Sequence, residues 1–181
     1  MKQLLLVSWL LSLSAILGLP EVKADVRMPL IFGNHMVLQQ DTRITIWGWA
    51  DAGETVEVVF AGQKVKTTAD TDGTWRVNLK PIKTKKEGQT LTIAGKNKLV
   101  YSDVLVGDVW VASGQSNMEW GIKVRKEYAD DISASEDPLL RLFFVPKNTS
   151  LEPLTDIEVP QGTSNPERDR PRNFRRTPTF R

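Results

Sequence analysis

The feature that most restricts the fold is an alternation of apolar and polar residues between Val26 and Val104. The clearest runs are Ile44 to Trp49, Val56 to Phe60 and Trp75 to Leu79. Period two places successive side chains on opposite faces of a β-strand. Turn residues separate the runs at intervals of about 8–12 residues, which is typical of antiparallel sandwiches. We therefore predict an antiparallel β-sandwich over residues 25–103.

Three short segments predict the turns of this β domain: 51–53, 61–62 and 70–73. The last of these, Asp70-Thr71-Asp72-Gly73, indicates a hairpin, because Asp and Gly tolerate the backbone of a tight turn. The lysine-rich run at 80–87 is read as a solvated loop.

The tryptophans and the histidine of the β domain can each be interpreted as structural or as functional residues. The tryptophans at 47, 49 and 75 are interpreted as packing residues, with a sugar-stacking platform as the alternative. His35, the single histidine of the chain, is interpreted as a hydrogen-bonded structural residue, with a catalytic role as the alternative.

The absence of cysteine excludes several kinds of site. Without it there is no disulfide scaffold, no Cys-ligated zinc or iron–sulfur site and no thiol nucleophile. With one histidine there is no multi-histidine metal site either. We expect neither a metal nor an organic cofactor.

The start of the chain has the pattern of a secretory signal peptide. Lys2 precedes an apolar run from Leu4 to Leu19, and the residues before Asp25 are suitable for cleavage. The run is short for the roughly 20 residues of a membrane span. We expect cleavage after residue 24 and a secreted or periplasmic protein with no membrane contact afterwards.

The net charge of +2 is unevenly distributed, because residues 161–181 contain six arginines and two acidic residues. Such a tail can contact nucleic acid. Export argues against that partner, so we expect no nucleic acid. We expect residues 161–181 to be disordered or non-native.

The second half of the chain changes pattern. Residues 105–113 form a continuous apolar run, as in a strand that is buried on both faces of a parallel sheet. Residues 128–132 suggest a short helix, and residues 138–145 a second buried strand. This order indicates the beginning of an α/β unit over residues 104–160.

A turn of small and polar residues follows the first of these strands. It contains Gly114, Gln115, Ser116 and Asn117. In open α/β sheets, chemistry is located where a buried strand ends. Ser116 could act as a nucleophile there, with the amides of Ser116 and Asn117 holding an oxyanion. An ordinary loop serine is the alternative on these grounds alone.

The segment GDVWVASGQSNMEW at 107–120 closely resembles the nucleophile segment of the sialate O-acetylesterase family, a branch of the SGNH-type hydrolases. FGNHMVLQQ at 32–40, WGWADAG at 47–53 and DGTW at 72–75 also resemble that family. The similarity spans roughly residues 27–160. It implies a β domain packed against an SGNH-like, flavodoxin-like α/β hydrolase domain.

The resemblance also implies an activity. It is the removal of acetyl groups from carbohydrate hydroxyls, with Ser116 as nucleophile and Gly114, Gln115 and Asn117 in the nucleophile turn. The substrate would be an acetylated carbohydrate. A non-catalytic carbohydrate-binding or interaction module is the alternative function. Neither the sugar nor the oligomeric state can be predicted.

The resemblance implies further residues that the sequence does not contain. The family carries a Gly-rich segment and an Asn that together complete the oxyanion hole, and a later Asp-x-x-His pair, and we recognise neither feature after Ser116. His35 belongs to the β domain instead. We therefore expect the chain to represent a truncated N-terminal portion of such an esterase, nearly inactive alone.

Overall fold

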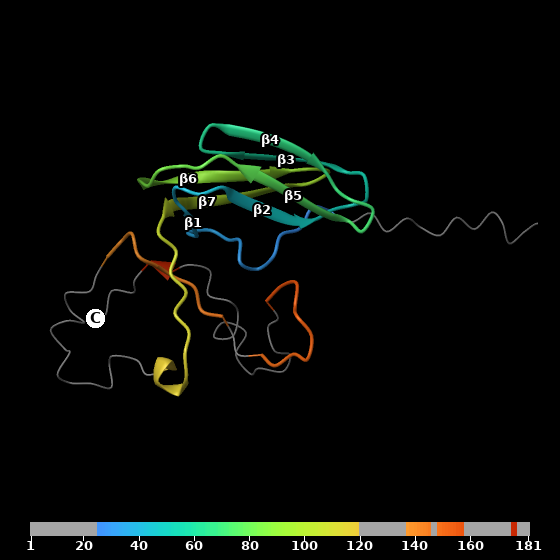
Figure 1. The fold of residues 1–181 in the computed structure, drawn as a ribbon. Helices are drawn as coiled ribbons and strands as arrows, with labels where there is room; N and C mark the ends of the chain where they lie inside the picture. Colours follow the sequence, from blue (N-terminus) through green and yellow to red (C-terminus); the bar gives the residue numbers. More distant parts are fainter. Residues whose placement is uncertain (1–24, 120–136, 146–147, 158–174, 177–181) are drawn as a thin grey trace, which may run out of the picture.

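A computed structural model describes residues 25–119, 137–145, 148–157 and 175–176 of the chain (Figure 1). The predicted signal peptide, the helix predicted at 128–132 and most of the tail at 161–181 lie outside these residues. Within the described residues, no helix has the length and hydrophobicity needed to cross a membrane.

Two sheets make up the folded body. The larger sheet has the strand order β1-β7-β6-β3-β4, and the smaller sheet pairs β2 with β5. In chain order the strands are β1 (Val37–Gln39), β2 (Ile44–Trp49), β3 (Thr55–Phe60), β4 (Gln63–Thr68), β5 (Thr74–Leu79), β6 (Lys85–Ala94) and β7 (Lys98–Gly107). The described chain is therefore mostly β, as the alternation predicts.

One hydrophobic core lies between the sheets. In β2, β3 and β5, buried side chains alternate with more exposed ones, which confirms the predicted period of two. The side chains of both sheets meet in a single cluster that includes Ile46, Val58, Phe60, Trp75 and Ile93. Figure 1 shows β2 and β5 crossing the five-stranded sheet that they cover.

The turns are predicted better than the pairing of the strands. Ala61-Gly62 joins β3 to β4 as a tight hairpin, because Phe60 pairs with Gln63. Residues 70–73 also form a turn, closed by a 2.9 Å bond from the Gly73 amide to the Asp70 carbonyl. This turn does not make the predicted hairpin. It passes the chain from the larger sheet to the smaller one, since β5 pairs with β2.

Two further strand predictions need correction. β1 runs parallel to β7, so the body is not purely antiparallel. Residues 80–87 are only partly a loop, because β6 begins at Lys85. Both corrections involve pairing with β7, whose partners are the preceding strand β6 on one edge and the sequence-distant β1 on the other.

The end of β7 departs from simple alternation. The register between β6 and β7 shifts near Gln89, and Asp103 has a positive φ of 54°. After this irregularity, three consecutive residues, Val104, Leu105 and Val106, are buried. β7 then continues to Gly107, beyond residue 103, where the sequence places the domain boundary.

The predicted buried strand at 105–113 is wrong beyond Gly107. Residues 108–113 form no strand, and the side chains of Trp110 and Val111 are 88% and 90% exposed. A strand needs partners for its backbone N–H and C=O groups. Among the described residues, no strand pairs with this stretch.

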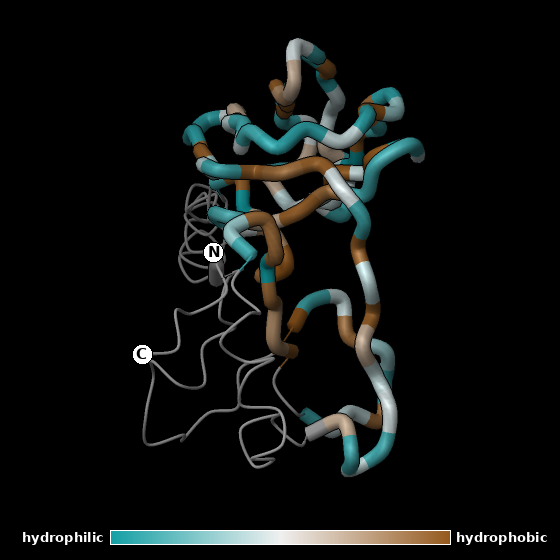
Figure 2. Tube along the Cα trace, turned by 90° about the vertical axis from the view of Figure 1, so that its left-hand side faces the viewer, coloured by the Kyte–Doolittle hydropathy of each residue, from teal (hydrophilic) through white to brown (hydrophobic). Residues whose placement is uncertain are grey.

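The strand predicted at 138–145 is also mostly absent. Only β8 (Arg141–Leu142) is a strand there, and it pairs with β9 (Arg175–Arg176). Leu139, Leu140, Leu142 and Phe144 are exposed rather than buried. β9 lies within the basic tail at 161–181. Figure 2 shows hydrophobic stretches both in the sheets and in the segments that leave them.

Candidate functional site

The predicted nucleophile turn is an exposed, compact turn beyond the end of β7. Ser116–Glu119 forms a short 3₁₀ helix, η1, and the Met118 amide donates a 2.9 Å hydrogen bond to the Gln115 carbonyl. Gly114, Gln115, Ser116 and Asn117 are all exposed residues. Figure 1 shows η1 well below the two sheets.

Gly114 lies close to the side chain of Met118 at the start of this turn. A Cβ atom added at Gly114 would lie 2.6 Å from Cγ of Met118, closer than real side chains approach. A larger residue at position 114 would require the exposed side chain of Met118 to move. The glycine thus permits the backbone to fold closely beside η1 at Ser116.

Two adjacent backbone amides of the turn lie beside the Ser116 hydroxyl. Among the described residues, the N–H groups of Ser116 and Asn117 donate no hydrogen bond. Adjacent unused N–H groups beside a serine hydroxyl are the donor type that stabilises an oxyanion in acyl transfer. The arrangement is chemically compatible with the roles that the sequence predicts for these residues.

The structure does not bring His35 to Ser116. Nδ1 of His35 lies 2.7 Å from Oδ2 of Asp103, so the imidazole is bonded within the β domain. This contact agrees with the structural reading of His35. Within residues 25–119, 137–145 and 148–157, no side chain is hydrogen-bonded to the Ser116 hydroxyl.

The segment at 32–40 organises the same end of the β domain. Phe32 is buried and packs edge-on against Trp47, with ring centroids 4.8 Å apart. Oδ1 of Asn34 accepts a 2.8 Å hydrogen bond from the Ser102 amide. Met36 is buried in the core. These contacts fix the chain immediately before β1.

Two glutamines continue this role where the chain leaves the sheet. Oε1 of Gln39 accepts a 2.8 Å hydrogen bond from the Val109 amide. Nε2 of Gln40 donates a 3.1 Å bond to Oδ1 of Asp108, and its Oε1 accepts from the Thr84 amide. The two side chains thereby hold the first residues of the stretch that leads to Ser116.

Sequence reasoning missed four residues of this region: Gln39, Gln40, Asp103 and Arg141. The glutamines end the segment at 32–40 that resembles the family. The alternation of apolar and polar residues could not predict their contacts with residues about 70 positions later. The sequence contains no indication of a role for Arg141 beyond its position in the apolar run at 138–145. Its guanidinium reaches the carboxylate of Asp103, with Nη2 3.2 Å from Oδ2.

The tryptophans are mainly packing residues, as the preferred interpretation has it. Trp75 is buried in the core, and Trp47 packs against Phe32. The guanidinium of Arg27 lies 4.5 Å above the ring of Trp49 and covers one of its faces. Among the described residues, no three His, Asp or Glu side chains gather in a way that could hold a metal ion.

No protein-family model matches the chain. Named proteins do. The chain is 31% identical to a sialate O-acetylesterase of Mus musculus over 141 residues, which cover 70% of this chain and 26% of the relative. It is 35% identical to that of Rattus norvegicus over 141 residues, or 69% and 25%. For the human sialate O-acetylesterase the identity is 36%, over 51% of this chain and 20% of the relative.

A solved structure shows the same relationship. A carbohydrate acetylesterase from Xanthomonas citri matches with a TM-score of 0.69 and 34% identity, over 74% of this chain and 31% of that protein. The chain spans about a quarter of the length of the sialate O-acetylesterases it matches. Over the matched residues, the chain is homologous to sialate O-acetylesterases and shares its fold with part of a carbohydrate acetylesterase.

Proposed function

We propose that the chain carries the nucleophile of a serine-dependent carbohydrate O-acetylesterase, and that Ser116 is that nucleophile. The observation that carries this proposal is the homology to sialate O-acetylesterases. A continuous match over 70% of 181 residues includes positions 107–120 wherever it begins. The nucleophile turn is therefore part of the similarity.

The proposed reaction is acyl transfer. The Ser116 hydroxyl attacks the carbonyl carbon of an acetyl ester, and the amides of Ser116 and Asn117 hold the oxyanion. The sugar oxygen leaves with a proton, and the acetyl group stays on Ser116. Water then attacks the acetyl-serine and releases acetate.

The proton transfer needs a general base, and His35 is not placed for it. Its Nδ1 is bonded to Asp103, and no contact joins it to η1 among the described residues. Serine is a weak nucleophile without a base. We therefore expect slow turnover from the 181-residue polypeptide, as oxyanion stabilisation alone supports only residual catalysis.

We also propose that the residues after β7, from about 108 onward, begin an α/β hydrolase domain next to the β-sandwich. The exposed apolar side chains at Val109, Trp110, Val111 and Phe144 support this. Side chains of this kind are ordinarily buried in a core.

An exported location is part of the same proposal. Val26, two residues after the proposed cleavage site, belongs to the β domain, because Asn97 bonds both the Val26 amide and the Val26 carbonyl at 2.8 and 2.9 Å. Export with cleavage predicts that the mature protein begins at Asp25. N-terminal sequencing of the protein from its own host would contradict this if Met1 were retained.

The alternative, a binding module without catalysis, has less support. Sugar-stacking platforms need exposed aromatic faces, whereas Trp75 is buried and Arg27 covers one face of Trp49. A pull-down on acetylated glycans tests this alternative. Tight binding that does not change in Ser116→Ala, without any ester hydrolysis, would favour the module.

The test of the esterase proposal is acetate release from an O-acetylated sugar by the full chain. We expect slow release that is abolished in Ser116→Ala and retained in Ser113→Ala, the matched serine three positions earlier. Equal release by the full chain and by Ser116→Ala would contradict the proposed nucleophile. Fast release would contradict the expectation that Ser116 is poorly activated in this polypeptide.

A further inference from the structure

Two residues of the β domain that contact each other both have a left-handed backbone. His35 has a φ of 65° and Asp103 a φ of 54°, and neither is glycine. Residues with a side chain rarely adopt this region, although Asp and His do so more often than most. Such conformations persist where the surrounding structure holds them, often at functional positions.

The backbone at Asp103 gives its carboxylate a particular direction. Asp103 lies beside the register shift between β6 and β7, and shifts of this kind redirect a side chain. The carboxylate also lies over Gly88, where an added Cβ would be 2.1 Å from Oδ1 of Asp103. Gly88 therefore leaves room for the carboxylate.

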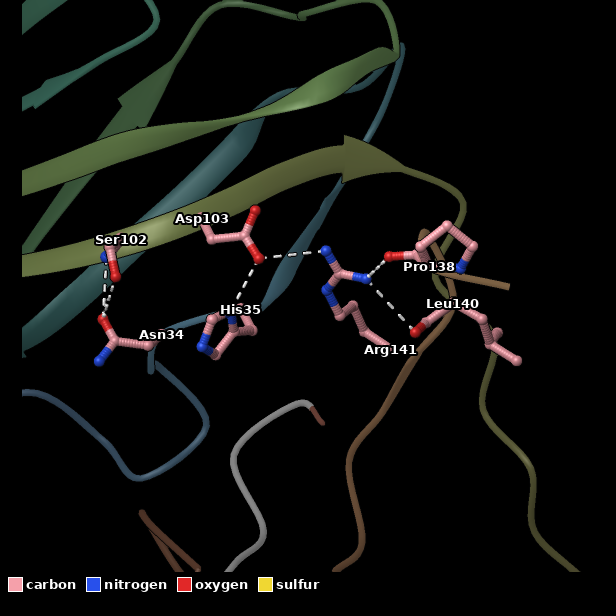
Figure 3. Close-up of polar contacts among 7 residues, drawn as sticks. All are labelled: Asn34, His35, Ser102, Asp103, Pro138, Leu140 and Arg141. Atoms are coloured by element: carbon pink, nitrogen blue, oxygen red, sulfur yellow. Dashed lines mark hydrogen bonds and ion pairs between the residues drawn. The ribbon is translucent and has the colours of Figure 1, made fainter. Parts of the chain in front are cut away.

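The redirected carboxylate joins two parts of the chain. Oδ2 of Asp103 lies 2.7 Å from Nδ1 of His35 and 3.2 Å from Nη2 of Arg141 (Figure 3). Nη1 of Arg141 in turn donates to the backbone carbonyls of Pro138 and Leu140. Arg141 thus ties its own loop together and attaches it to β7.

The ion pair differs from an ordinary surface pair in its burial. The side chain of Arg141 is 1% exposed, whereas that of Asp103 is 23% exposed. Surface pairs contribute little to stability, but removal of one partner of a buried charge leaves the other unpaired at a high cost. The position of Arg141 therefore depends on the Asp103 carboxylate.

We propose that His35, Asp103 and Arg141 form a joint that fixes residues 138–142 against the β domain. His35 holds the Asp103 carboxylate in place, and the carboxylate holds Arg141. The joint sits at the same end of the β domain as Gln39 and Gln40, which hold Asp108 and Val109. The β domain would in this way set the position of two separate downstream segments.

Trypsin cleavage after Arg141 tests the joint, because the protease must draw this buried side chain into its specificity pocket. In the full chain, cleavage at the Arg141–Leu142 bond requires local opening. We expect Asp103→Asn, which keeps a residue tolerant of positive φ, to speed this cleavage about fivefold or more. Glu87→Gln is the control, because it removes an exposed carboxylate from the neighbouring strand.

Arg141→Lys provides a second variant outside the β domain, so that a folding defect of Asp103→Asn does not decide the result. Lysine remains a trypsin site but lacks the planar fork that reaches Asp103 and the two carbonyls together. We expect faster cleavage at this bond as well, with cleavage after Arg76 in β5 unchanged. Unchanged cleavage at position 141 in both variants would overturn the proposal. An equal rise at Arg76 would also overturn it, because the effect would then be general unfolding.

Discussion

At the scale of single residues, Gly88 and Gly107 differ only in what surrounds them. An added Cβ at Gly88 would overlap Asp103, with 2.7 Å to its Cα. An added Cβ at Gly107 would make ordinary contacts with Val37 and Thr84 at 3.7 and 3.9 Å. The same substitution should therefore have different effects at the two positions of one β domain.

We expect Gly88→Ala to lower the free energy of unfolding by about 1–3 kcal/mol, the usual cost of overpacking. Gly107→Ala should change it by less than about 1 kcal/mol, because alanine restricts the unfolded chain and fits here. Urea denaturation of both variants measures this difference. Similar values for the two variants would show that the contact with Asp103 does not constrain position 88.

Asp72 supplies a pH-dependent contribution to the turn before β5. Its Oδ1 accepts hydrogen bonds of 2.8 Å from both the amide and the hydroxyl of Thr74, and the backbone bond is the main cause that lowers the pKa of Asp72 below 3.8. A depressed pKa in the folded state means that the stabilisation is complete above the unfolded value. It is lost as the pH falls from 3.8 toward the folded value.

The variant Asp72→Asn keeps an acceptor oxygen but does not ionise. We expect the chain to be more stable than this variant at neutral pH, and the gap in unfolding free energy to narrow below pH 3.8. Urea denaturation at neutral and at acid pH measures the gap. A gap that stayed constant or widened on acidification would contradict the assigned role of the carboxylate.

What the sequence could predict of the site depends on how local each feature is. Ser116 and its neighbours form a contiguous motif, so the turn could be recognised from adjacent residues. The partnership of Asp103 with His35 and Arg141 spans 68 and 38 positions. The periodicity of a sequence cannot predict contacts between residues so far apart. The positive φ of Asp103 occurs beside the irregular pairing of β6 and β7, which the sequence pattern also does not show.

At the scale of elements, β7 lies between β1 and β6 in the larger sheet. Its first part alternates, and its last part is a buried run whose members pair with β1 in parallel. Alternation predicted the strands well because burial on one face of a sheet imposes it. It could not predict which strands pair, and so the parallel β1 pairing and the path from β4 to β5 were missed.

The extent of β7 leads to a prediction about fragments. Residues 25–107 should form a cooperative β fold that is more stable than residues 25–103. The longer fragment retains Val104, Leu105 and Val106, which are at most 5% exposed. Burial of three such side chains contributes at least about 3 kcal/mol.

Thermal unfolding monitored by circular dichroism compares the two fragments. We expect a clearly higher midpoint for residues 25–107, with the same β-type spectrum. Equal midpoints would mean that the parallel pairing of β1 with β7 is not needed for the core. A disordered spectrum for residues 25–107 would contradict the independence of the β domain.

At the scale of the whole molecule, two regions differ in the burial of their apolar side chains. The β domain buries them between its sheets, whereas residues 109–111 and 139–145 leave many of them exposed. The alternation made the first region predictable. The continuous apolar runs at 105–113 and 138–145 predicted buried strands, but burial depends on partner strands that the described residues do not supply.

The central claim is that Ser116 is the reactive serine of an esterase related to the sialate O-acetylesterases. Its most direct test is peptide mass spectrometry of the full chain after incubation with 4-nitrophenyl acetate, an ester that acetylates a reactive serine and releases 4-nitrophenolate. We predict an acetyl group on Ser116 and little on Ser113, which is exposed in the same stretch. Acetylation at equal levels on both serines, or on Ser113 alone, would contradict the claim.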